Sequence, residues 1–400
     1  MSSPTQATGK ISAGYWPIMA LGFRPFYLGA AIFAVLALPL WLGWYSGALS
    51  VQPAMNGFTW HMHEMIFGFA PAVIAGFLLT AVRNWTGRPT PTGTALAGLF
   101  LLWIAGRVLL LTGPLPLAAI VDLMFLPAVG VAVAIPIWKS RNKRNFKVLA
   151  IIAALTIANL TFHLSNLNIL PNVLVITAYK LALDIIAILI AIMGGRVIPA
   201  FTSNALPTAN VRRDPRVEFV AIGSLIVIAI AGLLSPWWAM PRGVWIVILA
   251  LGALSHLIRV ALWEPHRTVS APLLLMLPVA YAWLPLSLVL RMLAEFGVVP
   301  MPTAVHALTI GAMSSLMLAM MVRSALGHTG RPLLASAAEI LAFSLLQLSA
   351  IVRVFAYSIP AEFYRSAVMA AGAMWTAAFA IFLAAYWPVL TRRRVDGRPG

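Results

Sequence analysis

The chain has 400 residues, of which 62% are hydrophobic and only 9% are charged. This composition excludes a soluble globular protein and a disordered one, and it indicates an integral membrane protein. The net charge of +17 does not indicate nucleic-acid binding, because the basic residues lie in short connections between long apolar stretches. The absence of cysteine excludes disulfides and iron–sulfur clusters, so any metal must be held by histidine, carboxylate, methionine or backbone groups.

The apolar stretches predict an all-α bundle of about twelve transmembrane helices, since each stretch is long enough to cross a bilayer. They are too long and too continuous for the strands of a β-barrel. A polar tail (1–16), a single bundle (17–390) and a basic tail (391–400) make up the predicted domain organisation. The predicted spans are 18–44, 58–82, 94–112, 116–138, 147–165, 173–199, 217–235, 242–262, 272–293, 302–325, 333–357 and 364–390.

The connections between the spans predict the orientation. Residues 139–147 include five lysines and arginines and residues 212–216 include three arginines, whereas 45–56, 113–117 and 166–172 carry no charge. Basic connections stay in the cytoplasm, so both termini are predicted to be cytoplasmic. In this orientation four of the seven histidines lie near the outer face, namely His61, His63, His163 and His306, and three lie near the cytoplasmic face, namely His256, His266 and His328.

Two of the predicted spans share a sequence pattern. His63, Gly68 and the Thr-Gly-Arg-Pro motif at 86–89 recur 243 residues later as His306, Gly311 and the same motif at 329–332. The 23 positions from histidine to motif correspond to roughly 35 Å of helix, which is enough to cross a bilayer. We therefore predict two structurally equivalent helices, each with a histidine near one face.

Charged residues inside the spans are costly unless they are paired or face a cavity. Lys180 and Asp184 are four residues apart, so they can pair on one helix face or, in a transporter, line a substrate path. Arg107, Asp122 and Arg353 can pair structurally, or an arginine can hold a haem propionate.

The spacing of the outer histidines predicts two neighbouring sites. His63 and His306 hold equivalent positions, so they are predicted to clamp a haem iron between two helices. His61 is two residues from His63, about 200° around the helix, and cannot bind the same metal. His61, His163 and Glu64 are the predicted copper ligands; the alternative is that His61 and Glu64 only hydrogen-bond to each other.

Several motifs carry a resemblance to a known family. They are GFRPFYLGA, WHMHEMIFGF, ANLTFHL, GGRVIPAFT, HALTIGAM and GHTGRPL, at 22–30, 60–69, 158–164, 194–202, 306–313 and 327–333. Over nearly its whole length the chain resembles the NnrS family. The resemblance implies a bacterial inner-membrane protein with twelve spans that contains haem and copper and is linked to nitric oxide metabolism and nitrosative stress. His61, His63, His163, His306 and His328 lie on the family's motifs.

Haem ligands on the second and tenth spans also resemble the catalytic subunit of haem–copper oxidases, although that pattern is incomplete here. The chain has no adjacent pair of histidines, and its tenth span has a single histidine, which argues against a copper site of three histidines. Pro278 stands where we expect a histidine in some relatives.

We therefore expect a protein that binds or reduces nitric oxide near the periplasmic face, with haem b and copper as cofactors and Arg107 near the haem. The chain has no dinucleotide-binding motif, so a quinol or a partner protein is the expected electron donor. Two alternatives stay open: a transporter without haem, and a haem-bearing sensor or metal-delivery protein without turnover. A visible absorption spectrum separates the transporter from the other two.

Overall fold

The computed structural model describes residues 16–50, 53–141 and 145–398. Within these ranges, twelve helical segments are long and apolar enough to cross a membrane. This confirms the predicted all-α bundle and shows a multi-pass membrane protein. Residues 1–15 of the expected N-terminal tail, and Lys143 and Arg144 of the basic connection, lie outside the described ranges. The orientation of the bundle across the membrane stays a prediction.

The second of the first six spans is a composite helix, which consists of α2 (Gly57–His63), η2 (Glu64–Phe69) and α3 (Ala70–Thr86) in continuous sequence. The other five spans are α1 (Phe23–Ser46), α4 (Gly93–Thr112), α5 (Leu115–Lys139), α6 (Phe146–Asn166) and α7 (Val173–Ala205). The largest difference from the predicted boundaries is in α7, which continues past residue 199. Pro199 does not end this helix because Ile198 and Thr202 are buried against the bundle, and tertiary packing outweighs the local preference.

The fourth of the second six spans is also a composite helix, which consists of α11 (Met301–His306), η5 (Ala307–Ser314) and α12 (Ser315–His328) in continuous sequence. The other five spans are α8 (Pro215–Leu234), α9 (Arg242–Leu262), α10 (Pro272–Glu295), α13 (Ala337–Phe355) and α14 (Ala361–Thr391). Short 3₁₀ turns accompany the spans at Pro17–Met19, Pro265–Thr268 and Ala356–Ser358.

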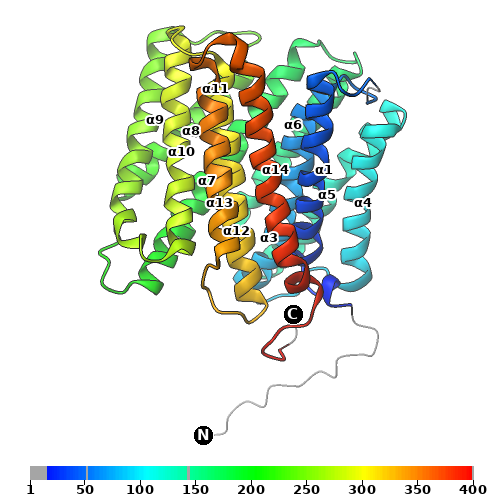
Figure 1. Cartoon of the computed structure of the whole chain (residues 1–400), viewed down its shortest axis with the longest axis vertical. Coiled ribbons are helices and arrows are strands. Elements are labelled where there is room, and N and C mark those ends of the chain that lie inside the picture. Colours follow the sequence, from blue (N-terminus) through cyan, green and yellow to red (C-terminus); the bar gives the residue numbers. More distant parts are fainter. Residues whose placement is uncertain (1–15, 51–52, 142–144, 399–400) are drawn as a thin grey trace, which may run out of the picture.

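The helices run side by side along the long axis of the molecule (Figure 1). The two composite helices and α10 have the largest share of buried residues among the spans, whereas α4, α8 and α9 have the smallest. The start of α1 and the end of α14 lie together, since Arg24 donates hydrogen bonds to the carbonyls of Leu390 and Arg392 at 2.9 and 2.8 Å. An even number of spans brings both ends of the bundle to the same face.

The two composite helices confirm the internal correspondence in the sequence. In each one a π-helical segment begins directly after the shared histidine, at Glu64 and at Ala307, which are again 243 residues apart. Each ends in a left-handed glycine of the shared motif, with φ of 64° at Gly87 and 76° at Gly330. π-helices are rare and are found mostly as single turns at functional sites, so their recurrence at equivalent positions indicates a shared structural role.

The shared glycine of each π-helix admits a large side chain from a neighbouring helix. A Cβ atom at Gly68 would lie 2.3 Å from Nη1 of Arg107 on α4, and a Cβ atom at Gly311 would lie 2.3 Å from Cδ2 of Trp283 on α10. Any larger residue at either position would force the neighbour away. The absence of a side chain at Gly68 thus allows Arg107 to lie in the core beside His63.

Candidate functional site

A buried group of six polar side chains lies where α2 passes into η2, and we call it the His63 cluster. Its members are His63 of α2, Glu64 of η2, Arg107 of α4, Asp122 of α5, and Asn159 and His163 of α6. None of them is more than 6% exposed. Buried polar groups in a membrane core must satisfy one another, so the geometry of this group is tightly constrained.

Three atoms of the His63 cluster converge on one point. Nε2 of His63 lies 3.1 Å from Nε2 of His163 and 3.3 Å from Oδ2 of Asp122, and the last two atoms are 2.9 Å apart. Ligands bound to one metal at about 2.1 Å in tetrahedral geometry are about 3.4 Å apart. The two imidazoles and the carboxylate therefore already have nearly the spacing of a metal site.

The remaining members orient these three donors. Nδ1 of His63 is 3.0 Å from Oε1 of Glu64, and Nε2 of His63 lies 3.1 Å from Oδ1 of Asn159. A histidine that binds a metal through Nε2 commonly donates its Nδ1 proton to a carboxylate in this way. Asn159 lies one turn before His163 on α6, and its Nδ2 donates to Oδ2 of Asp122 at 2.8 Å. Metal-binding residues are commonly held in this way by outer hydrogen bonds.

The charges of the His63 cluster do not balance without a cation. Arg107 is the one guanidinium in it, and it donates to Oε1 of Glu64 at 2.5 Å and to Oδ1 of Asp122. Oε2 of Glu64 has no hydrogen-bond partner in the described chain. Two carboxylates and one guanidinium leave one negative charge if both imidazoles are neutral. A bound metal cation, or a protonated imidazole, would compensate this charge.

The other side of the composite helix faces a cavity of about 80 Å³, which we call the His306 cavity. Its polar lining includes His61, His306 and Arg353. The ring of Trp41 stacks on His61 with 4.1 Å between centroids. Nδ1 of His306 is 2.7 Å from the carbonyl of Pro302, so it acts as the donor, and Nε2 carries the lone pair that can bind a metal.

The His306 cavity fits the polar requirements of a haem. His61 and His306 are imidazoles suited to an axial position, and the guanidinium of Arg353 suits a propionate. A volume of about 80 Å³ holds a small molecule but not a whole porphyrin, so side chains must move to admit one. Three of the lining residues are methionines, Met62, Met65 and Met313, whose flexible side chains readily take new positions.

The structure brings the four predicted outer histidines together but pairs them differently from the prediction. His63 was expected to face His306, and His61 to face His163. Instead His61 shares a cavity with His306, while His63 contacts His163. Equivalent positions in a repeat need not face each other, because each histidine faces whatever packs against its own helix. His61 and His63 lie on different faces of the composite helix, as their spacing predicts.

Two other predicted site residues also have different neighbours. Glu64 contacts His63 and Arg107 and not His61. Arg107 belongs to the His63 cluster and does not line the His306 cavity, whose lining includes Arg353 instead. The aspartate and the asparagine of the His63 cluster were not predicted as ligands. Asp122 is separated from His63 by 59 positions of sequence, and only the packing of α5 against the composite helix brings the two together.

The three histidines predicted on the cytoplasmic side lie outside both sites. His256 is buried and lies 2.8 Å from the hydroxyl of Tyr281, and His266 is exposed. His328 lines a separate cavity at the other end of α12. The predicted pairing of Lys180 with Asp184 is replaced by an ion pair of 2.8 Å between Arg291 and Asp184.

The bundle and its two polar sites define a class: a polytopic helical membrane protein with two histidine sites back to back on one composite helix. Within this class, the chain belongs to the NnrS family, whose model, described as NnrS protein, matches residues 17–394. A comparison with curated proteins gave no match. The predicted family is thereby confirmed over nearly the whole chain.

Proposed function

We propose that the protein is a bacterial inner-membrane haem–copper protein that binds or reduces nitric oxide near the periplasmic face. The observation that carries this proposal is the arrangement of His61 and His63, which point from one helix into two different sites. One site is compact and preformed for a metal ion, and the other has room for a small molecule. The family name supplies the link to nitric oxide.

We assign the two cofactors to the two sites. His63, His163 and Asp122 would hold copper, and His61 and His306 would hold haem b, with Arg353 as the partner of a propionate. When bound, these groups would supply a one-electron carrier and a metal that accepts nitric oxide. If His61 and His306 both bound the haem, one of them would have to leave before a gas could bind it.

The surrounding residues keep the sites dry and oriented. Trp41 covers one face of His61, and Pro302 accepts the Nδ1 proton of His306. Arg107 holds Glu64 and Asp122 close to the two imidazoles. The contact with Pro302 fixes which nitrogen of His306 carries a proton, and a low-dielectric surrounding strengthens this hydrogen bond.

Reduction would convert two nitric oxide molecules, two protons and two electrons into nitrous oxide and water. The electrons would come from a quinol or from a redox partner protein. A protein that binds nitric oxide without turnover uses the same two sites, and an assay of nitric oxide consumption with a reduced quinol distinguishes the two activities.

The proposal is tested by absorption spectroscopy and metal analysis of the purified protein. A Soret band that shifts with dithionite is expected, with copper in the same preparation. His61→Ala and His306→Ala should each change the haem spectrum and keep copper, whereas His163→Ala should lose copper and keep the haem bands. His256→Ala is the matched control for a buried histidine outside both sites and should change neither. A protein without haem bands contradicts the proposal.

One observation favours the transporter alternative. A cavity of about 320 Å³ is lined by Lys180, Asp184 and Arg291, and intramembrane charges of this kind line substrate paths in transporters. A transporter needs neither haem nor copper, so the same spectrum and metal analysis separate the two functions.

A further inference from the structure

Three cavities follow one another along the two composite helices, and the His306 cavity is the first. The second, which we call the apolar cavity, has a volume of about 100 Å³ and is lined by Ile74 and Met317 among others. The third, which we call the His328 cavity, has a volume of about 380 Å³ and lies at the other end of α12. Both composite helices line the three cavities in this order, the first with residues within 61–69, 73–78 and 77–85, and the second with residues within 306–314, 313–320 and 320–328. The cavities therefore form a series along the bundle.

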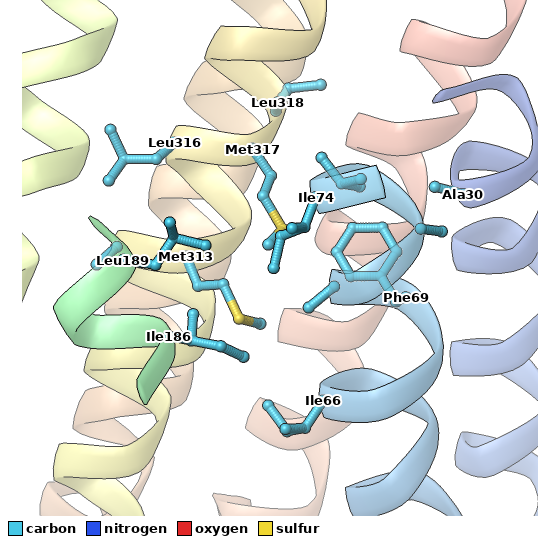
Figure 2. Close-up of a cluster of buried hydrophobic side chains, with 14 of the residues drawn as sticks. Ala30, Ile66, Phe69, Ile74, Ile186, Leu189, Met313, Leu316, Met317 and Leu318 are labelled. Carbon is cyan, nitrogen blue, oxygen red and sulfur yellow. The ribbon is translucent and has the colours of Figure 1, made fainter. Parts of the chain in front are cut away.

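Neighbouring cavities of this series share lining residues. Met313 lines both the His306 cavity and the apolar cavity. The side chains that line both the apolar cavity and the His328 cavity are Tyr27, Phe77, Met193, Val197 and Met320. Figure 2 shows Met313 and Met317 pointing from the second composite helix toward the first, where Ile74 lies. Because a methionine side chain is unbranched and flexible, Met313 can open a passage between the apolar cavity and the His306 cavity.

The lining of the apolar cavity disfavours water and ions. Tyr27 is the one polar side chain among the described residues that line it, and its hydroxyl already accepts a hydrogen bond from Ser324 at 3.2 Å. A buried water needs about two to four polar partners, which the described lining does not offer. An ion in this cavity would lose its hydration without a compensating charge. A ligand of the apolar cavity must therefore be neutral and independent of hydrogen bonds.

The volume of the apolar cavity selects a small ligand. Its volume of about 100 Å³ is several times the ~10–15 Å³ that one water-sized molecule needs. It is close to the volume of about 80 Å³ of the His306 cavity, which holds a small molecule but not a porphyrin. A diatomic gas therefore fits the apolar cavity as it stands, whereas a lipid chain would require the lining side chains to move.

We propose that the apolar cavity binds a small neutral gas and passes it to the His306 cavity, with Met313 as the gate between the two. A neutral diatomic gas enters without the desolvation cost that excludes ions and water. The path would thus admit the gas to His61 and His306 while water and ions stay out. The gas site depends only on the cavity, whereas the identity of the gas as nitric oxide and its delivery to haem rest on the proposed function.

The first experiment is X-ray diffraction from crystals of the whole protein under xenon pressure, because xenon occupies dry apolar cavities. Its anomalous signal is expected beside Met313, Met317 and Ile74. Met317→Trp should fill the cavity and remove this signal, and Ile74→Trp should fill it from the other composite helix if the first variant does not fold. Met124→Trp makes the same substitution at an exposed methionine of α5 and should keep the signal. Absence of xenon from the wild-type cavity would overturn the proposal.

The second experiment measures delivery, by flash photolysis of carbon monoxide from the reduced haem. Met317→Trp should slow rebinding from solution about tenfold, which corresponds to about 1.36 kcal/mol in the barrier. It should leave the absorption spectrum unchanged, because Met317 does not line the His306 cavity. Met313→Ala should speed rebinding, since it shortens the side chain between the two cavities.

Equal rebinding rates in Met317→Trp and Met124→Trp would overturn the passage of gas through the apolar cavity. A preparation without haem bands would contradict the proposed function and the delivery step with it, whereas xenon in the apolar cavity of the same preparation would still establish the gas site. The two failures are thereby distinguished.

Discussion

Replacing Arg107 by leucine tests whether the His63 cluster is held by a buried ion pair. The arginine is 6% exposed and contacts two carboxylates, of which Glu64 is fully buried and Asp122 is 3% exposed. At an effective dielectric constant of about 20, one pair of charges ~4 Å apart interacts by about 4 kcal/mol. Removing one partner of a buried pair costs about 3–5 kcal/mol, so we expect a loss of this size in unfolding free energy.

The assay is reversible unfolding in mixed micelles by sodium dodecyl sulfate, followed by circular dichroism. Adding Glu64→Gln to Arg107→Leu removes one of the uncompensated charges and should recover about 2 kcal/mol, within the range of coupling between contacting residues. The exposed pair of Arg267 and Glu264 at 3.9 Å is the control, and Arg267→Leu should cost less than about 1 kcal/mol. A loss below 1 kcal/mol for Arg107→Leu, or no recovery in the double variant, would refute the reasoning.

Three more predictions use separate measurements. Gly68→Ala places a methyl group 2.3 Å from the guanidinium of Arg107 and should lower the unfolding free energy by about 1–3 kcal/mol. Gly98→Ala meets no atom within 4 Å and should be neutral or slightly stabilising. Equal effects of the two substitutions would contradict the packing argument. Removing metal with a chelator should destabilise the wild type by about 4 kcal/mol if the metal is at ~1,000 times its Kd. The chelator should leave the stability of His163→Ala unchanged. If both proteins lose the same stability, the metal is bound elsewhere. A reporter fused at Gly113 should be active in the periplasm and one at the C-terminus in the cytoplasm, and the reverse pattern would invert the predicted orientation.

The fold was predictable because bilayer thickness and continuous apolar sequence dictate helix number and length. The main misjudged boundary, at the end of α7, shows the limit of local signals. Pro199 disfavours a helix locally, yet buried side chains on either side keep it helical. The π-helices could not be predicted, since hydrophobic periodicity does not resolve one extra residue within a turn. The repeat did predict that the two composite helices are equivalent.

The histidines of the two sites could be predicted from the sequence, but their pairing and the roles of Asp122 and Asn159 could not. Intramembrane polarity identified His61, His63, His163 and His306, and helical geometry correctly separated His61 from His63. Which residue faces which depends on how helices distant in sequence pack, and one sequence does not contain this information. Asn159 lies four residues before His163, and this spacing is the one local signal for its role, because it places both side chains on the same face of α6.

The π-helix after His63 also fixes the rotation of α2 relative to α3. Each residue of a helix advances the chain by about 100°, so deleting one residue from Glu64–Phe69 would turn everything on its N-terminal side by about that angle. His61 would then leave the His306 cavity and His63 would leave Asp122, although no ligand had been mutated. The extra residue in the turn of each π-helix thus determines the rotation of the helix that precedes it. A one-residue deletion should abolish both sites together while the membrane topology is kept.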